Sequence, residues 1–80
     1  MDSNGVKKFS VKNGILTVEL NNCKTWNIFN LEQSDMDKVL EVLNNKYPII
    51  IIKEYSFVIF NYQQPMITCI YSDIQEVRNG

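Results

Sequence analysis

The chain contains no histidine and no alanine, and it has only one arginine, two prolines and three glycines among its 80 residues. Histidine is the usual general base near neutral pH and the usual partner of a nucleophilic serine or cysteine, so its absence removes most hydrolytic mechanisms. The glycines stand far apart, at positions 5, 14 and 80, and form no phosphate-binding loop. We therefore expect no enzymatic activity, no catalytic residues and no cofactor.

Cysteine is also scarce, and Cys23 and Cys69 are not spaced as metal ligands. The longest unbroken apolar run, Ile49 to Ile52, is far shorter than the roughly 20 residues that cross a membrane. No basic segment followed by an apolar one opens the chain, as a signal peptide would. We expect two reduced thiols in a cytoplasmic protein that binds neither metal nor membrane, with one disulfide as the alternative.

The charges nearly cancel, because the chain has eight Lys and Arg and nine Asp and Glu, which gives a net charge of −1. The chain as a whole has no field that attracts nucleic acid, and we do not expect it to bind nucleic acid strongly. A composition of 45% hydrophobic and 21% charged residues is typical of a packed domain. Residue types with AT-rich codons (Phe, Ile, Asn, Lys and Tyr) fill 35 of 80 positions, which indicates a low-GC bacterium or its phage.

The strongest local signal is the segment 12–15, Lys-Asn-Gly-Ile. Asn-Gly supplies both positive φ angles of a type I′ turn between two strands. A two-residue turn pairs Val11 with Leu16 and Phe9 with Val18 on one face, and both pairs are apolar. Because the turn and the alternation of side chains agree on one register, the sequence predicts a half-buried hairpin.

A second turn is expected at 21–23, as a three-residue loop in which an asparagine adopts the left-handed conformation. That loop places Val18 opposite Trp26 and extends the apolar face into a third strand over 25–30. The first third of the chain therefore predicts a three-stranded antiparallel meander. We expect residues 1–5 to be mobile.

A helix is predicted over about 34–46, because apolar side chains recur there at a spacing of three and four residues. Ser34 is the expected N-cap. Asn44 and Asn45 are expected at its end, since Pro48 cannot continue a helix. The stripe expected to face the core consists of Met36, Val39, Leu40, Leu43 and Tyr47.

Three apolar runs follow, over 49–52, 57–60 and 66–71, and they are rich in the β-branched and aromatic residues that favour strands. The fold class is therefore α+β: an N-terminal three-stranded antiparallel meander, one amphipathic helix and a C-terminal three-stranded meander (βββαβββ), in a single domain over 1–80. Residues 72–80 are compatible with a strand or a short helix, and we favour the helix.

The runs over 49–52 and 57–60 do not alternate with polar residues, which indicates strands with both faces out of water. One helix covers only one face. The N-terminal meander, a second copy of the chain or a different protein must cover the other, and the sequence leaves these alternatives open. Because a chain this small has a thin core, we expect a homo-oligomer, most simply a two-fold dimer.

Protein binding is the leading functional expectation, because the chain has more aromatic side chains than a small core needs. The size and composition suggest an accessory or inhibitory protein of a phage or other mobile element. The alternatives are a ligand-binding oligomer with a pocket between subunits, and a weak single-strand nucleic-acid binder that uses the lysine-bearing first meander. The candidate interaction surface consists of Trp26, Phe29, Asn30, Tyr55, Asn61, Tyr62 and Tyr71.

Overall fold

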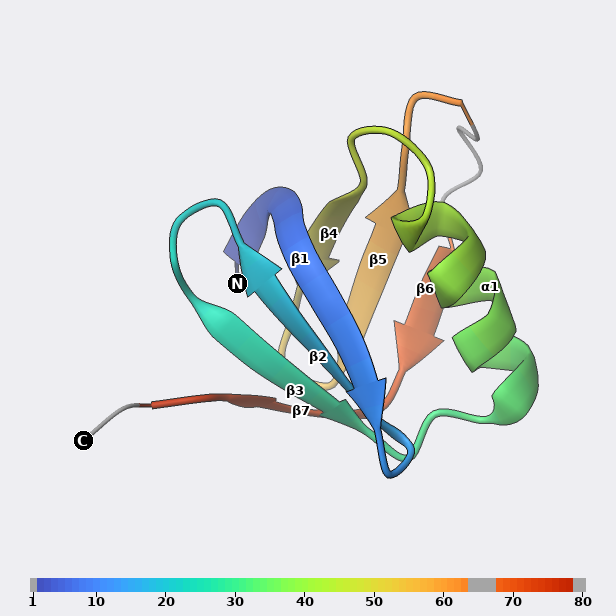
Figure 1. The fold of residues 1–80 in the computed structure, drawn as a ribbon. Coiled ribbons are helices and arrows are strands. Elements are labelled where there is room, and N and C mark those ends of the chain that lie inside the picture. Colours follow the sequence, from blue (N-terminus) through green and yellow to red (C-terminus); the bar gives the residue numbers. More distant parts are fainter. Residues whose placement is uncertain (1, 64–67, 79–80) are drawn as a thin grey trace.

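A computed structural model describes residues 2–63 and 68–78, and in these residues it shows one helix and one sheet of seven antiparallel strands. The α+β class is therefore confirmed, while the layout βββαβββ is matched only roughly because a seventh strand is present. In chain order the elements are β1 (Asp2–Lys12), β2 (Ile15–Leu20), β3 (Thr25–Phe29), α1 (Gln33–Leu43), β4 (Ile49–Ile52), β5 (Ser56–Phe60), β6 (Thr68–Tyr71) and β7 (Asp73–Glu76) (Figure 1).

The strands lie in the order β6-β5-β4-β1-β2-β3-β7, so the two strands at the ends of the sheet are neighbours in the chain. Only Ser72 separates them. The sheet must therefore curl until its two ends meet. At the junction, Ser72 donates its backbone N–H to the Tyr55 carbonyl at 3.1 Å, and beyond it β7 pairs with β3.

β1 also changes its partner along its length. Residues 2–5 pair with β4 and the remainder pairs with β2, with a register shift between Val6 and Lys8. Strands that bend at such points form the corners between two crossed halves of a sheet. Gly5 lies at this corner, where an added Cβ would come within 2.6 Å of the Asn21 Nδ2 atom. Residues 2–5, which we expected to be mobile, thus belong to the sheet, and Met1 lies outside the described residues.

The first hairpin has the predicted turn and register. Asn13 and Gly14 have φ angles of 54° and 76°, as a type I′ turn requires. The pairing places Phe9 opposite Val18 and brings the other apolar residues to the same face.

The predicted three-residue loop at 21–23 also forms, and it places Val18 opposite Trp26. The expectation that an asparagine takes the left-handed conformation is wrong, because Cys23 does so with a φ of 70°. Asn22 stabilises the loop differently: its Oδ1 accepts the backbone N–H of Lys24 at 3.0 Å.

The helix begins and ends earlier than the predicted range of 34–46. Its N-cap is Glu32 rather than Ser34, and no side chain caps it. Asn30 explains the early start, because its φ of 60° turns the chain sharply at the end of β3. At the other end, the Leu40 carbonyl accepts both the backbone N–H of Asn44 at 3.0 Å and its side-chain amide at 2.9 Å, and the Asn45 side chain donates to the Glu41 carbonyl at 2.9 Å.

The sequence predicts that Tyr47 continues the buried stripe of the helix, and this prediction is wrong. It lies beyond the end of α1, has a φ of 57° and is 74% exposed. Val42 is buried on the helix instead. The change follows from the early end of α1, since helical spacing no longer holds beyond residue 43.

The expected C-terminal helix is also wrong, because Asp73–Glu76 form β7 and pair with β3. Ile74 lies opposite Ile28 and packs against the core, so pairing with a distant strand decides the conformation. Residues 66 and 67, which we expected in the preceding strand, lie outside the described residues, as do residues 79 and 80.

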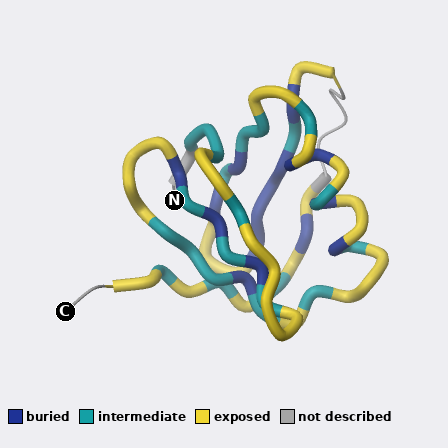
Figure 2. The backbone as a smooth tube through the Cα atoms, in the orientation of Figure 1, coloured by how far each residue is buried: buried dark blue, intermediate teal, exposed yellow. Residues whose placement is uncertain are grey.

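The hydrophobic core fills the inner face of the curled sheet, and the buried residues in Figure 2 lie mainly along its strands and the facing side of α1. The N-terminal strands and α1 therefore cover the same face of β4 and β5. The buried core residues are Leu16, Val18, Leu20, Ile28, Met36, Val39, Val42, Leu43, Ile50, Ile52, Phe57, Ile59 and Ile70. No helix in the described part of the chain is long and apolar enough to cross a membrane.

Asn61 joins the end of β5 to the helix from within the core. It is 1% exposed, its Nδ2 donates to the Val42 carbonyl at 3.0 Å, and its Oδ1 accepts the Gln63 backbone N–H at 3.0 Å. A buried amide with both ends satisfied fixes the position of the helix, because any displacement leaves polar groups unpaired.

The turn at Gly14 gives a first test of the fold. Replacing Gly14 with alanine should lower the free energy of unfolding by about 1 kcal/mol, because a Cβ disfavours its φ of 76°. Asn13→Gly is the control and should change stability by less than about 0.5 kcal/mol, since glycine adopts positive φ freely. Urea denaturation measures both variants. Equal stabilities for the two variants would contradict a type I′ turn.

The buried amide gives a second test. Asn61→Ala should lower the free energy of unfolding by about 2 kcal/mol, because the Gln63 N–H loses its acceptor and the Val42 carbonyl keeps only the Asn45 N–H at 3.2 Å. Asn44→Ala is the matched control, since Asn44 is exposed, has a φ of −81°, and its side chain bonds a Leu40 carbonyl that the Asn44 N–H already reaches. Chemical denaturation of both variants distinguishes them, and a loss no greater for Asn61→Ala than for Asn44→Ala would show that Asn61 is not buried as described.

Candidate functional site

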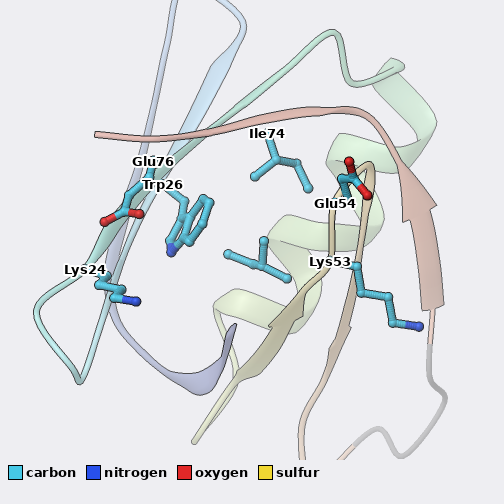
Figure 3. Close-up of a pocket in the computed structure, with 7 residues that line it drawn as sticks. Lys24, Trp26, Lys53, Glu54, Ile74 and Glu76 are labelled. Atoms are coloured by element: carbon cyan, nitrogen blue, oxygen red, sulfur yellow. The ribbon is translucent and has the colours of Figure 1, made fainter. Parts of the chain in front are cut away.

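A cleft opens beside the edge of β7 that does not face β3. It lies where the chain passes from β6, which pairs with β5, into β7. Its volume is about 510 Å³. It lies between β3 and β7 on one side and the end of β4 and the following turn on the other (Figure 3). The residues that line it are Lys24, Trp26, Ile52, Lys53, Glu54, Ile74 and Glu76.

The register of β7 determines which backbone groups face the cleft. Val77 donates its N–H to Thr25 in β3, and hydrogen-bonding residues alternate along an antiparallel strand. Gln75 therefore also faces β3, whereas Ile74 and Glu76 direct their N–H and C=O groups away from it. Ser72 fits the same alternation, because its N–H points to the Tyr55 carbonyl. Within the described residues, no strand pairs with this edge of β7.

The floor of the cleft is apolar and its mouth is charged. Trp26 and Ile74 are half-buried and lie beside the core residue Ile52. In Figure 3, the Trp26 ring and Ile74 lie toward the middle of the cleft. The two lysines and two glutamates stand at its sides, Lys24 with Glu76 and Lys53 with Glu54, so that neither sign of charge dominates.

A second feature is the solvent side of β4, β5 and β6, which we call the outer face. The prediction that both faces of residues 49–60 are out of water holds for β5, whereas the outward side chains of β4 are only half-buried. Val58, which is 8% exposed, lies between Ile51 and Cys69 in the pairing and does not join the core cluster. The outer face consists of Ile49, Ile51, Ser56, Val58, Phe60, Cys69 and Tyr71.

The residues of the predicted interaction surface do not come together. Trp26 points inward to the cleft, and Phe29 is on the opposite side of β3 because side chains alternate. Asn30 is exposed next to Phe29, and its Nδ2 donates to the Asp73 carboxylate at 3.1 Å. The prediction that Asn61 belongs to the interaction surface is wrong, because Asn61 is buried and its side chain is hydrogen-bonded to α1.

The tyrosines of that predicted surface are all strongly exposed, between 69% and 80%. Tyr71 lies on the outer face, and Tyr55 stands in the turn before β5, where its carbonyl receives the Ser72 N–H. Tyr62 follows β5 at its other end. Of the predicted surface residues, Tyr71 therefore lies on the outer face, and Tyr55 and Tyr62 stand at the two ends of its central strand, β5.

Three lysines of the first meander lie near acidic side chains. Lys7 and Lys8 approach Glu19 at 3.8 and 3.3 Å, and Lys24 lies at the mouth of the cleft beside Glu76. Trp26 faces the interior, so it does not share a surface with Lys8. Both cysteines are free and exposed.

Sequence reasoning missed the cleft, although one signal pointed to it. Ile74 and Val77 were compatible with the strand alternative for residues 72–80, and Ile74 is the apolar residue that β7 places in the cleft. Lys53 and Glu54 line the cleft because the turn between β4 and β5 lies near β7. No local sequence pattern encodes the position of this turn relative to so distant a strand.

The orientation of the β7 backbone gives a test by hydrogen exchange. The amide protons of Gln75 and Val77 bond to β3 and should exchange about tenfold more slowly than those of Ile74 and Glu76, which face the cleft. Exchange monitored residue by residue by NMR measures this alternation. Equal protection at all four positions would contradict an open edge.

Comparison of the chain with protein-family models, curated proteins and solved structures gives no match.

Proposed function

We propose that the chain is a protein-binding module that associates with a second copy of itself through the outer face. The observation that carries this proposal is the uncharged, largely apolar character of the outer face, on strands whose opposite side already packs against α1 and β2. Val58 is buried, but Ile49, Ile51 and Phe60 remain half-exposed, and covering such apolar surface is the usual source of association energy.

The absence of charge on the outer face favours a second copy as the partner. In a two-fold contact the same patch meets itself, so that charges of one sign would face each other and repel. The outer face contains no lysine, arginine, aspartate or glutamate. The net charge of −1 for the chain adds little repulsion between two copies.

The size of the outer face predicts a weak dimer. Three strands about 4.8 Å apart and four residues long make a flat centre of roughly 14 by 13 Å. A standard interface covers about 800 Å² per partner, which is a large part of a total accessible surface of 5362 Å². The exposed rings of Tyr55, Tyr62 and Tyr71 must supply much of the remaining contact, as an amphipathic rim around an apolar centre.

A charge in the centre of the outer face should prevent association. Ile51→Lys should weaken the dimer at least about tenfold, because a lysine facing its own copy would be buried without a partner. Ile15→Lys is the matched control, since Ile15 is also a half-buried strand residue but lies in β2, away from the outer face. Sedimentation equilibrium between about 1 and 100 µM should give a dissociation constant on the order of 10 µM for the wild type and the control.

The two cysteines supply an independent readout. Cys69 lies on the outer face and Cys23 in the loop before β3, and both are exposed in the single chain. Alkylation of Cys69 should slow as the concentration rises, whereas Cys23 should react at one rate throughout. A single species of 9.4 kDa at all concentrations, or equal weakening by both lysine variants, would refute the proposal.

A further inference from the structure

We propose that the cleft binds an extended peptide segment of a partner protein as an added strand on the free edge of β7, with a bulky apolar side chain of the peptide over Trp26. This binding is separate from self-association, because the cleft and the outer face share no residue.

The backbone of β7 supplies the first argument. The N–H and C=O groups of Ile74 and Glu76 face the cleft, and in the described residues no strand pairs with them. These groups repeat at the two-residue spacing of a β-ladder, and an extended peptide presents its own groups at the same spacing. Addition of a strand to a free edge is a common mode of peptide recognition, in which the main chain gives affinity and side-chain pockets give specificity.

The floor of the cleft supplies the second argument. Residues directly opposite each other in a ladder point to the same face of the sheet. The side chains of Ile74 and Glu76 point inward, on the same side of the sheet as Trp26 and Ile28. A peptide residue paired with either of them therefore directs its side chain toward the half-buried Trp26 ring. A large apolar side chain of the peptide gains the most binding free energy there, because its own surface and that of the Trp26 ring are both removed from water.

The shape and charge of the mouth select the kind of ligand. A cleft of about 510 Å³ lies within the usual range for ligand pockets, and an extended segment, unlike a helix, has backbone groups free to pair with the edge of β7. Lys24 and Glu76 flank one part of the mouth, and Lys53 and Glu54 flank another. A mouth with both signs of charge suits a segment with one apolar residue between polar ones, and it does not favour a polyanion.

The test begins with peptides selected from a random heptapeptide library on the immobilised protein. The selected peptides, synthesised with blocked ends, should shift the fluorescence of Trp26, which is the only tryptophan in the chain. They should also slow hydrogen exchange at the amides of Ile74 and Glu76. A selected peptide that is N-methylated at the residue pairing with β7 should lose binding, because it lacks the N–H that the added strand donates.

One substitution tests the edge itself. Glu76→Pro removes an N–H that faces the cleft and leaves the bonds of Val77 to β3 intact, and an edge position tolerates proline. It should weaken peptide binding about tenfold. Glu76→Ala changes the same side chain and keeps the N–H, so it should bind within about threefold of the wild type. Thermal unfolding and the slow exchange of Val77 verify that both variants are folded.

Several outcomes would overturn the inference. These are a library that yields no binder, peptides that bind Glu76→Pro as well as the wild type, and N-methylated peptides that bind unchanged. Binding of phenylalanine amide alone with the affinity of the selected peptides would assign the cleft to a small ligand instead. Peptides whose binding is lost in Ile51→Lys and kept in Glu76→Pro would assign binding to the outer face, which separates failure of this inference from failure of the proposed dimer.

Discussion

The structure depends on the exchange of pairing partner at Ser72. Before this residue the chain forms β6 and pairs with β5, and after it the chain forms β7 and pairs with β3. This change of partner brings the two ends of the sheet together. β1 makes a corresponding bend at Gly5. With these two corners, a chain of 80 residues wraps one sheet around one core, and α1 covers that core from the side. A flat sheet of the same strands would expose most of the residues that are buried here.

The same exchange leaves two surfaces uncovered. Because the chain turns away from β5 at Ser72, no strand among the described residues pairs with the backbone groups of Ile74 and Glu76 on that side, and the cleft opens next to them. Because α1 and the N-terminal strands cover the inner face of β4 and β5, the outer face is the solvent side, where Ile49 and Ile51 are half-buried and Tyr71 is exposed. The cleft offers an unpaired backbone edge with a tryptophan beneath it, and the outer face offers neutral apolar side chains. These chemistries suit different partners.

Much of the local structure could be predicted from the sequence, because it depends on residues close together in the chain. Asn13-Gly14 determines the first hairpin, and the loop length determines that Trp26 lies opposite Val18. The errors concern distant contacts. The sequence around Ile74 did not reveal its pairing with Ile28, more than forty residues away. The burial of Asn61 depends on the Val42 carbonyl, and no pattern around Asn61 distinguishes it from the exposed Asn30. The candidate site was therefore predicted only in its parts, through Trp26 and the tyrosines.

The exchange at Ser72 can be measured directly by NMR through contacts between Hα protons. In antiparallel pairs that do not exchange hydrogen bonds, the two Cα atoms approach to about 4.5 Å and their Hα protons give strong nuclear Overhauser effects. The register predicts such effects between Tyr71 and Ser56 and also between Ile74 and Ile28, in the same molecule. Both effects in one spectrum would establish that the last strand passes from β5 to β3. The absence of the contact from Ile74 to Ile28 while that from Tyr71 to Ser56 persists would contradict the curled sheet and, with it, the cleft.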